Sequence, residues 1–204
     1  MINSAEYWEK RYKRGRNSGS GSYGRLARFK ADVINRVIAE TRAASLMDFG
    51  CGDGNQLSLM TPLPYVGLDV SRTALAALRA RFADQPLYRF LHPDDLPGNL
   101  RCDITVSGDV IYHLVEDEVF ETYMEDLFQH ALRFVVIYSS NHEEPYTGSH
   151  IRHRRFTDFI AARFPEWRRV LHIPNPYPWD PARKTETTFS DFHIFAAPAQ
   201  AGAG

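Results

Sequence analysis

The residues with the clearest chemistry in this chain are three closely spaced glycines and an aspartate in the strand-like segment that follows them. Gly50, Gly52 and Gly54 come after an apolar stretch, and the segment 65–70 carries Asp69 near its end. Glycines in a turn let the backbone approach a ligand closely, and an acid at the end of the next strand can bind two ribose hydroxyls. The order of strand, glycine turn, helix, strand and acid predicts an α/β nucleotide-binding unit.

The spacing of these glycines bears on which nucleotide is bound. Dinucleotide-binding proteins carry the pattern G-x-G-x-x-G, whereas the position three after Gly52 is Asn55. The pattern therefore disfavours NAD and FAD. With Asp48 two residues before Gly50, the run reads acid-x-G-x-G-x-G, and it resembles the signature of the class I S-adenosylmethionine-dependent methyltransferases.

This resemblance extends over about residues 25–197 and implies roles for several residues. The glycine run would surround the methionine part of S-adenosyl-L-methionine, Asp69 would bind its ribose, and an acid at 94 or 95 would contact its adenine. Gly108 and Asp109, after the fourth strand, would lie beside the reactive centre. The expected cofactor-binding residues are Asp48, Gly50, Gly52, Gly54, Asn55, Asp69, Val70, Asp94, Asp95 and Gly108. The stretch 93–100 departs from the family, because it is too short for the usual helix before the fourth strand.

Short apolar segments alternate with amphipathic segments along the chain, and together they must position these residues. Composition predicts strands at 45–50, 65–70, 87–91, 104–107, 134–140, 168–173 and 190–197. Helices are expected at about 25–41, 54–60, 72–83, 116–131 and 154–164. The alternation predicts an α/β, Rossmann-like fold, with a seven-stranded, mostly parallel sheet, helices on both faces and an antiparallel edge hairpin.

The composition indicates the number of domains in the chain and its cellular location. Its 204 residues, 44% hydrophobic and 24% charged, suit one domain with a sizeable core. We expect an N-terminal lid or cap over 1–24, a single methyltransferase domain over 25–197 and a disordered tail over 198–204. Two cysteines, a polar N-terminus and the lack of an apolar run of about 20 residues predict a cytoplasmic protein without disulfides or membrane contact.

Histidines and acids follow the fourth and fifth strands, whose carboxyl ends share one edge of the sheet. Transfer of a methyl group to an alcohol benefits from a general base or a metal ion. Histidine is the natural base near neutral pH. We expect His142 to be the base, with His113 and Asp109 as the other candidate catalytic residues. Alternatively, Asp109, Asn141 and Glu144 supply oxygen ligands to Mg²⁺.

Aromatic and basic side chains near these clusters predict the acceptor site. Aromatic faces beside polar groups suit a sugar or another polyol, and arginines suit a carboxylate or phosphate. The expected acceptor-binding residues are Tyr7, Trp8, Arg11, Tyr12, His150, His153 and Arg154. The first four of these, with the Gly/Ser stretch 17–24 behind them, make the chain similar to small sugar O-methyltransferases of bacterial polysaccharide pathways, including mycobacterial methylmannose polysaccharide synthesis.

Three functions remain open at this point. The first is S-adenosylmethionine-dependent methylation of a hydroxyl on a carbohydrate or related small polyol. The second is N-methylation of a nucleic acid or a protein, which the near-neutral charge of −1 and the lack of an Asn-Pro-Pro-Tyr type motif disfavour. The third is non-catalytic binding of S-adenosylmethionine. We expect a small-molecule or oligosaccharide acceptor and no nucleic-acid or membrane partner, while the sequence does not indicate an oligomeric state.

Overall fold

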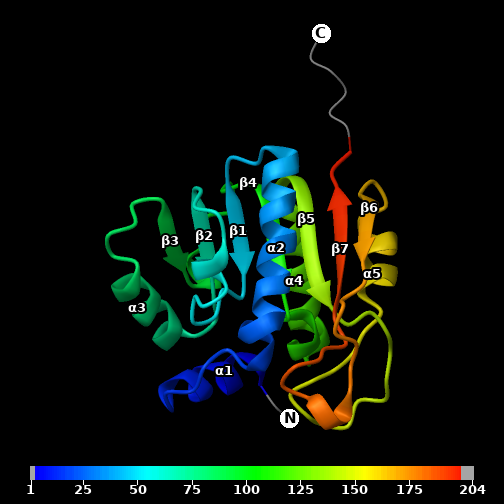
Figure 1. Cartoon of the computed structure of the whole chain (residues 1–204). Coiled ribbons are helices and arrows are strands. Elements are labelled where there is room, and N and C mark those ends of the chain that lie inside the picture. Colours follow the sequence, from blue (N-terminus) through cyan, green and yellow to red (C-terminus); the bar gives the residue numbers. More distant parts are fainter. Residues whose placement is uncertain (1–2, 199–204) are drawn as a thin grey trace.

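The computed structural model describes residues 3–198, which are built around a seven-stranded sheet (Figure 1). The strands are β1 (Leu46–Phe49), β2 (Tyr65–Leu68), β3 (Tyr88–Leu91), β4 (Cys102–Gly108), β5 (Ala131–Ser139), β6 (Arg168–Ile173) and β7 (Asp191–Ala196). Their order across the sheet is β3-β2-β1-β4-β5-β7-β6. The first five strands are parallel, while β7 is antiparallel to both β5 and β6. The predicted mostly parallel sheet with an antiparallel edge pair is confirmed.

The strand order reverses beside β1, and this reversal locates the crevice in which a ligand can bind. The chain passes outward from β1 to β2 and β3, then returns to the other side of β1 for β4. In open α/β sheets, ligands bind outside the carboxyl ends of the strands at such a point. Gly50 follows β1 and Asp109 follows β4, and both line one cavity.

Helices cover both faces of the sheet because the strand side chains alternate between the faces. On one face, α2 (Gly24–Thr41) and α3 (Arg72–Arg81) pack on residues such as Leu46 and Val136. On the other face, α4 (Asp117–Gln129) and α5 (Phe156–Arg163) pack on the neighbouring residues Met47 and Ile137. Central strands that are buried on both faces explain the short, continuous apolar runs in the sequence.

The prediction of a helix at 54–60 is wrong, because only a short 3-10 helix forms there, at Leu57–Leu59. Gly54 has φ +73°, a left-handed conformation in which an α-helix does not begin. Met60 is already extended, with φ −92° and ψ 152°. Pro62 follows closely, and the residue before a proline avoids the helical region. The chain therefore reaches β2 directly from the glycine turn.

The N-terminal segment contains a helix, α1 (Ser4–Lys13), that the sequence pattern does not reveal. The side chain of Asn3 caps it by accepting a hydrogen bond from the backbone N–H of Glu6 at 2.8 Å. Ser4 and Tyr12 are its buried residues, so α1 lacks the broad apolar stripe that identifies a helix from sequence. Figure 1 shows α1 lying across the end of the molecule toward which β1 and β5 point.

Two further expectations concern short segments of the chain. Between β3 and β4 a 3-10 helix at Pro93–Asp95 stands in place of a full helix, as the shortness of this stretch predicts. Residues 199–204 of the expected disordered tail lie outside the described residues. None of the helices within residues 3–198 is long and apolar enough to cross a bilayer.

Candidate cofactor and acceptor site

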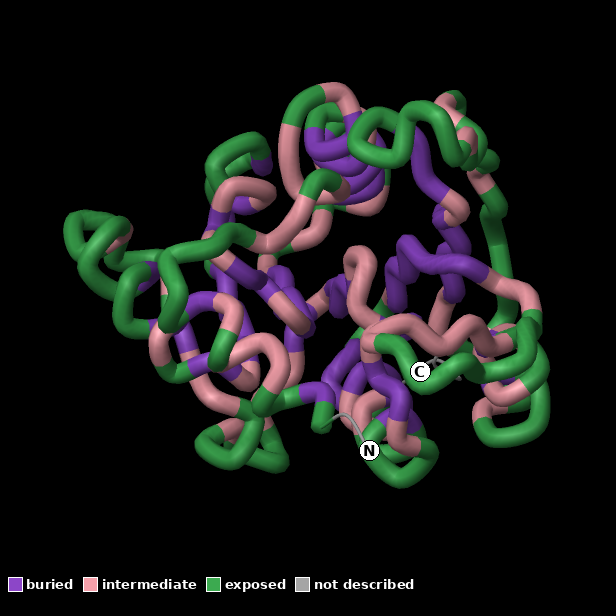
Figure 2. Tube along the Cα trace, turned by 90° about the horizontal axis from the view of Figure 1, so that it is seen from below, coloured by how far each residue is buried: buried purple, intermediate pink, exposed green. Residues whose placement is uncertain are grey.

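A cavity of about 700 Å³ opens at the carboxyl ends of the parallel strands. Sites for small-molecule ligands usually have volumes of this order and are largely apolar. Its walls come from α1 and α4, from residues 18–22, from the loops after β1, β2 and β4, and from loops that include residues 150–151 and 179–189. Figure 2 views the molecule from this end and shows exposed segments around a buried interior. Segments that are far apart in the sequence therefore share one cavity.

The glycine turn forms one wall of this cavity, and positions 50 and 52 both require glycine. Gly50 has φ +88° and Gly52 has φ +60°, both in the left-handed region that other residues rarely adopt. A side chain at residue 50 would collide with Val110, and one at residue 52 would collide with Ser18. Gly50 lines the cavity directly. The expected residues of the turn that do not line it are Gly52, Gly54 and Asn55.

Asp53, within the same turn, fastens the N-terminal segment to it. The Asp53 carboxylate accepts hydrogen bonds from the backbone N–H of Ser18 and from the hydroxyl of Tyr23, both at 2.8 Å. The Ser18 hydroxyl accepts the backbone N–H of Asp53 at 2.9 Å. The side-chain amide of Asn55 donates to the carbonyl oxygen of Ser22 at 2.6 Å. The Gly/Ser stretch, which its composition presents as flexible, is therefore bonded to the glycine turn.

Asp69 follows β2 and lines the cavity together with Val70. Its oxygens accept hydrogen bonds from the backbone N–H groups of Gly52 at 3.0 Å and Ser71 at 2.8 Å. Burial raises the pKa of Asp69 to about 6, although these two bonds act in the opposite direction. A carboxylate oxygen has two lone pairs, so a carboxylate held in this way can still accept hydrogen bonds from a diol such as ribose.

Asp48, which precedes the glycine turn, is buried behind the cavity wall and does not line the cavity. The hydroxyl of Tyr65 donates a hydrogen bond to its carboxylate at 2.8 Å. Burial raises the pKa of Asp48 to about 6, while the bond from Tyr65 and the charge of Lys30 lower it. The contact with Tyr65 joins β1 to β2, so in this structure Asp48 braces the strands below the turn.

The two acids expected to contact adenine lie on the surface. Asp94 and Asp95 are exposed and face the guanidinium of Arg72 at 3.9 Å and 3.7 Å. Neither acid lines the cavity, whereas their neighbours Pro93 and Leu96 do. This segment therefore contributes apolar side chains to the cavity wall, and the two acids point elsewhere on the surface.

After β4, Asp109 forms a buried ion pair with Lys30, which is not among the residues predicted for the site. The ammonium of Lys30 lies 2.7 Å from Asp109 Oδ2, and the hydroxyl of Ser190 donates to Oδ1 at 2.9 Å. Lys30 belongs to the apolar face of α2, four residues from both Leu26 and Ile34, and its side chain is 3% exposed. Lysine is almost never fully buried without a partner. A lysine at a core position of an amphipathic helix is the signal that would have revealed the pair.

His113 lines the cavity, and one hydrogen bond fixes its tautomer. Its Nδ1 lies 2.9 Å from the backbone carbonyl oxygen of His150. A carbonyl oxygen is only an acceptor, so Nδ1 carries the proton and Nε2 carries the lone pair. Burial lowers the pKa of His113 to about 4, against the opposing effect of this hydrogen bond. The imidazole is therefore neutral at pH 7.

Aromatic rings from α1 surround this imidazole. Tyr7 stacks on His150 with ring centroids 4.7 Å apart, and His150 stacks on His113 at 5.4 Å. Trp8 meets His113 edge-on at 5.0 Å. The expected acceptor residues that line the cavity are Tyr7, Trp8, Arg11, Tyr12 and His150. The structure thus brings the N-terminal aromatic residues to the histidine after β4.

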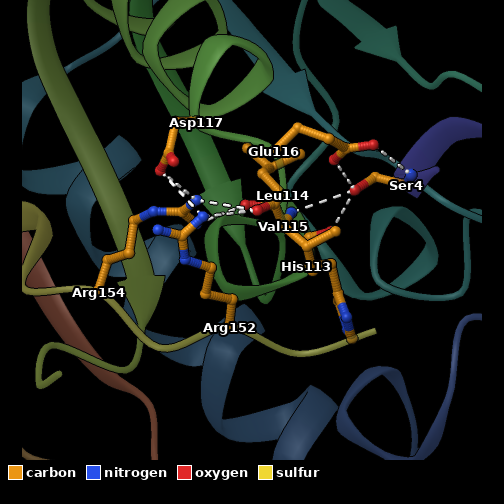
Figure 3. A network of polar contacts seen from close by, with 8 residues as sticks. All are labelled: Ser4, His113, Leu114, Val115, Glu116, Asp117, Arg152 and Arg154. Carbon is orange, nitrogen blue, oxygen red and sulfur yellow. Dashed lines mark hydrogen bonds and ion pairs between the residues drawn. The ribbon is translucent and has the colours of Figure 1, made fainter. Parts of the chain in front are cut away.

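A network of polar contacts holds the backbone that carries His113 (Figure 3). The hydroxyl of Ser4 donates to the His113 carbonyl oxygen at 2.8 Å and contacts Glu116. From the other side, Arg154 donates to backbone carbonyls of the same segment and pairs with Asp117 at 2.9 Å. Arg154, expected at the acceptor, does not line the cavity. Its guanidinium holds the segment that positions His113.

The second histidine cluster lies outside the cavity lining, contrary to the sequence-based expectation. His142 Nε2 is 3.0 Å from Glu144 Oε1, and the His142 ring stacks on His153 at 4.5 Å. None of these three residues lines the cavity. A general base must reach the proton that it removes. The position of His142 therefore does not fit the role of first base.

The expected magnesium ligands are not brought together either. Asp109 is paired with the ammonium of Lys30, which would repel a second cation. The side-chain amide of Asn141 donates to the hydroxyl of Thr157 at 3.0 Å, and Glu144 pairs with His142. Each of the three oxygen-bearing side chains is engaged by a different partner. The arrangement therefore does not fit a magnesium site made from this set.

Comparison with known proteins shows which family the residues around this cavity resemble. Residues 47–135 match a family model described as a methyltransferase domain. This stretch, which is less than half of the chain, is similar to a methyltransferase domain. The matched segment holds β1 to β4 and α4, and thus the glycine turn, Asp69 and His113. No curated protein matches the methyltransferase in sequence.

Solved structures share the fold of this methyltransferase along most of the chain. The N-methyltransferase NodS from Bradyrhizobium japonicum WM9, in complex with S-adenosyl-L-homocysteine, has a TM-score of 0.73 and 12% identity, covering 97% of this chain and 100% of that one. Magnesium protoporphyrin IX methyltransferase (ChlM) from Synechocystis PCC 6803 has a TM-score of 0.67 and 13% identity, with 95% and 97% covered. The CurJ carbon methyltransferase has a TM-score of 0.65 and 11% identity, with 97% and 62% covered.

The domain match and the shared fold confirm the prediction of a class I, S-adenosylmethionine-dependent methyltransferase with a Rossmann-like sheet. The similar structures include an N-methyltransferase and a carbon methyltransferase. The fold therefore does not specify the atom that receives the methyl group. The choice of a sugar hydroxyl and of a histidine base stays a prediction.

Proposed function

We propose that this methyltransferase transfers the methyl group of S-adenosylmethionine to a hydroxyl of a carbohydrate or related small polyol, with His113 as general base. The observation that carries the proposal is the shared cavity, in which Gly50 and Asp69 line one part and His113 another. Methyl transfer requires that donor and acceptor be held in contact. One cavity that joins the glycine turn to a neutral imidazole meets this requirement.

The residues around the glycine turn fit the methyl donor. When bound, S-adenosylmethionine supplies a methyl group activated on a sulfonium sulfur. The fixed carboxylate of Asp69 is suited to its ribose hydroxyls, and the apolar surfaces of Pro93 and Leu96 are suited to adenine. The left-handed conformation of Gly50 lets the backbone approach the ligand without a side chain between them.

His113 offers an unprotonated nitrogen that can serve as a general base for a hydroxyl. The carbonyl oxygen of His150 holds its Nδ1–H, so Nε2 can accept the hydroxyl proton as the new oxygen–carbon bond forms. Its lowered pKa keeps this nitrogen unprotonated at neutral pH. The stack with His150 and the edge of Trp8 restrict rotation of the ring. These contacts favour His113 over His142 as the base.

The side chains that line the cavity support a small, polar acceptor. Tyr7, Trp8 and Trp179 contribute aromatic surface, while Glu118 and Lys184 contribute charged groups. Such a mixture suits a sugar, which has apolar faces and a rim of hydroxyls. The helix α1 covers this part of the cavity, and its cover favours a free sugar or short oligosaccharide over a macromolecule.

The test measures S-adenosyl-L-homocysteine formation with a panel of sugars, polyols and amines. His113→Gln should lower turnover of a hydroxyl acceptor by about 10²–10⁴-fold, with S-adenosylmethionine affinity retained in calorimetry. His172→Gln, on the surface strand β6, is the matched control and should keep full turnover. His142→Gln tests the residue that the sequence favours as general base. Turnover lost in His142→Gln but kept in His113→Gln, or methylation of amines alone, would contradict the proposal.

A further inference from the structure

Three metal-binding side chains gather in the loop after β5, outside the cavity lining. One ligand atom from each of His142, Glu144 and His153 lies within 4.8 Å of the other two. His142 Nε2 and Glu144 Oε1 are 3.0 Å apart, and the two imidazole rings stack at 4.5 Å. In a tetrahedral zinc site with bonds of about 2.0–2.1 Å, ligand atoms lie about 3.4 Å from one another. A modest closure of the loop would therefore let all three contact one ion.

The surroundings of the two histidines fit metal ligation. His153 Nδ1 lies 2.7 Å from the hydroxyl of Ser140, a residue that is 1% exposed. Asn141, directly before His142, is hydrogen-bonded to Thr157 of α5 through both its amide nitrogen and its amide oxygen. A ligating histidine binds the ion with one nitrogen and usually donates with the other to a nearby oxygen. Ser140 provides that oxygen for His153, which leaves Nε2 for an ion.

The charge state of the cluster also suits a cation. Glu144 adds one carboxylate to the two imidazoles, and an exposed position lets it move toward an ion.

A second stacked histidine pair in this protein shows what a cluster unsuited to a cation looks like. The rings of His172 and His193 stack at 4.5 Å, and His172 Nε2 lies 3.1 Å from the carboxylate of Asp191. However, Nδ1 of His193 lies 3.4 Å from a guanidinium nitrogen of Arg169. That positive charge would repel a metal ion, so this pair serves as an internal comparison.

From this arrangement we infer that His142, Glu144 and His153 bind one Zn²⁺ or a similar late first-row divalent ion. Two imidazoles and one carboxylate are a ligand set that zinc accepts, with a fourth position for water. Mg²⁺ prefers oxygen ligands and near-octahedral geometry, so the set selects against it. The site shares Glu144 with the magnesium site that the sequence suggests, but it differs in its other two ligands and in its metal.

An ion at this position would fix one wall of the acceptor cavity without touching the reacting atoms. His153 meets Phe189 edge-on at 4.7 Å, and its ring lies 6.1 Å from that of Tyr112. Phe189 and Tyr112 both line the cavity. The ion would join the beginning and the end of the stretch 142–153, which is largely exposed between them.

Calorimetric titration of the full chain with Zn²⁺, after metals are removed with a chelator, tests the site. We expect one ion per chain, bound at micromolar concentration or below. His142→Ala, His153→Ala and Glu144→Gln should each weaken zinc binding by about tenfold or more, and Ser140→Ala by about 10–100-fold, as for loss of an outer-shell partner. Titration with Mg²⁺ should give no comparable binding.

His172→Ala is the matched control, because it removes one imidazole from the stacked pair beside Arg169 and should leave zinc affinity unchanged. Thermal unfolding without metal shows which variants are folded. Glu144→Gln changes an exposed side chain, so it stays decisive even where a histidine variant fails to fold. Lack of zinc binding by the wild-type chain, or equal affinity in wild type and Glu144→Gln, would overturn the inference.

Discussion

The ammonium of Lys30 and the carboxylate of Asp109 lie 2.7 Å apart, where α2 meets the end of β4. Their side chains are 3% and 12% exposed, and the hydroxyl of Ser190 donates a further hydrogen bond to the carboxylate. Asp109 has φ +59°, in the left-handed region. Gly21 of the N-terminal segment packs so closely that a side chain there would meet this carboxylate at 2.9 Å. The ion pair thus joins α2 to the end of β4, and Ser190 and Gly21 bring two further segments against it.

Lys30→Met should lower the free energy of unfolding by about 3–5 kcal/mol, because it leaves the Asp109 carboxylate buried without its counter-ion. The double variant Lys30→Met/Asp109→Asn should recover much of this loss, since neither charge then remains buried. Urea unfolding at pH 7 measures both effects. A double variant destabilised by the full sum of the two single variants would show that the residues are not coupled.

The stability of the protein should depend on the protonation of His113. An unfolded histidine has a pKa of about 6.5, whereas the folded pKa of His113 is about 4. Between these values the unfolded chain binds more protons at this residue, so acidification lowers the free energy of unfolding. His113→Gln removes this linkage. The loss of stability between pH 7 and pH 5 should therefore be smaller in the variant by about 1–2 kcal/mol.

The protonation of two buried acids changes the free energy of unfolding in the opposite direction. Burial raises the pKa values of Asp48 and Asp69 to about 6, so the folded chain binds more protons there between about pH 4 and pH 6. Acidification through that window favours the folded state at these two residues. The prediction therefore concerns the difference between wild type and His113→Gln in urea unfolding. An equal change with pH in both proteins would contradict it.

Asp69→Asn should weaken S-adenosylmethionine binding by about 10–100-fold, the effect expected for loss of a hydrogen bond to a charged group. Asparagine keeps an acceptor for the backbone N–H of Gly52 or Ser71, so the turn should persist. Asp94→Asn is the control and should change affinity less than about twofold, because Asp94 lies on the surface beside Arg72. Calorimetry distinguishes the two variants. Equal losses would place Asp94 in the cofactor site.

The parts of the fold that could be predicted are those with a local signal. The strands are short apolar runs because both faces of the central sheet are buried, and the glycine turn needs glycine for its left-handed residues. The helix α1 escaped prediction because few of its residues are buried. The expected helix at 54–60 does not form, because Gly54 is left-handed and Pro62 follows closely.

The sequence indicates that a residue lies at the cavity where the end of a strand fixes its position. It does not do so where contacts between distant parts of the chain decide that position. Gly50 and Asp69 lie in the cavity wall because they follow β1 and β2. The choice between His113 and His142 depends on which loop the N-terminal helix covers. That helix is held by Ser4 and Glu116, which are 112 positions apart in the sequence. A contact between residues so far apart leaves no pattern in any short stretch of the sequence.

The second attachment of α1 gives the last prediction. The carboxylate of Glu9 accepts hydrogen bonds from the hydroxyls of Ser71 at 2.6 Å and Thr73 at 2.8 Å, at the start of α3. The bond from Ser71 has the largest effect on the pKa of Glu9, which is lowered to about 2. Because α1 has few buried residues, loss of this attachment should increase its local opening. Glu9→Ala should therefore speed hydrogen exchange of the α1 amides.

Glu6→Ala is the matched control for this experiment, because Glu6 pairs with Lys10 on the exposed side of the same helix. Both variants remove one glutamate and one ion pair from α1, since Glu9 also pairs with Lys13 at 3.2 Å. They differ in the bonds to α3, so exchange measured by mass spectrometry should be faster in Glu9→Ala than in Glu6→Ala. Equal exchange rates would mean that the attachment at Ser4 alone holds α1 over the cavity. In that case Ser4→Ala, and not Glu9→Ala, should speed hydrogen exchange of the α1 amides.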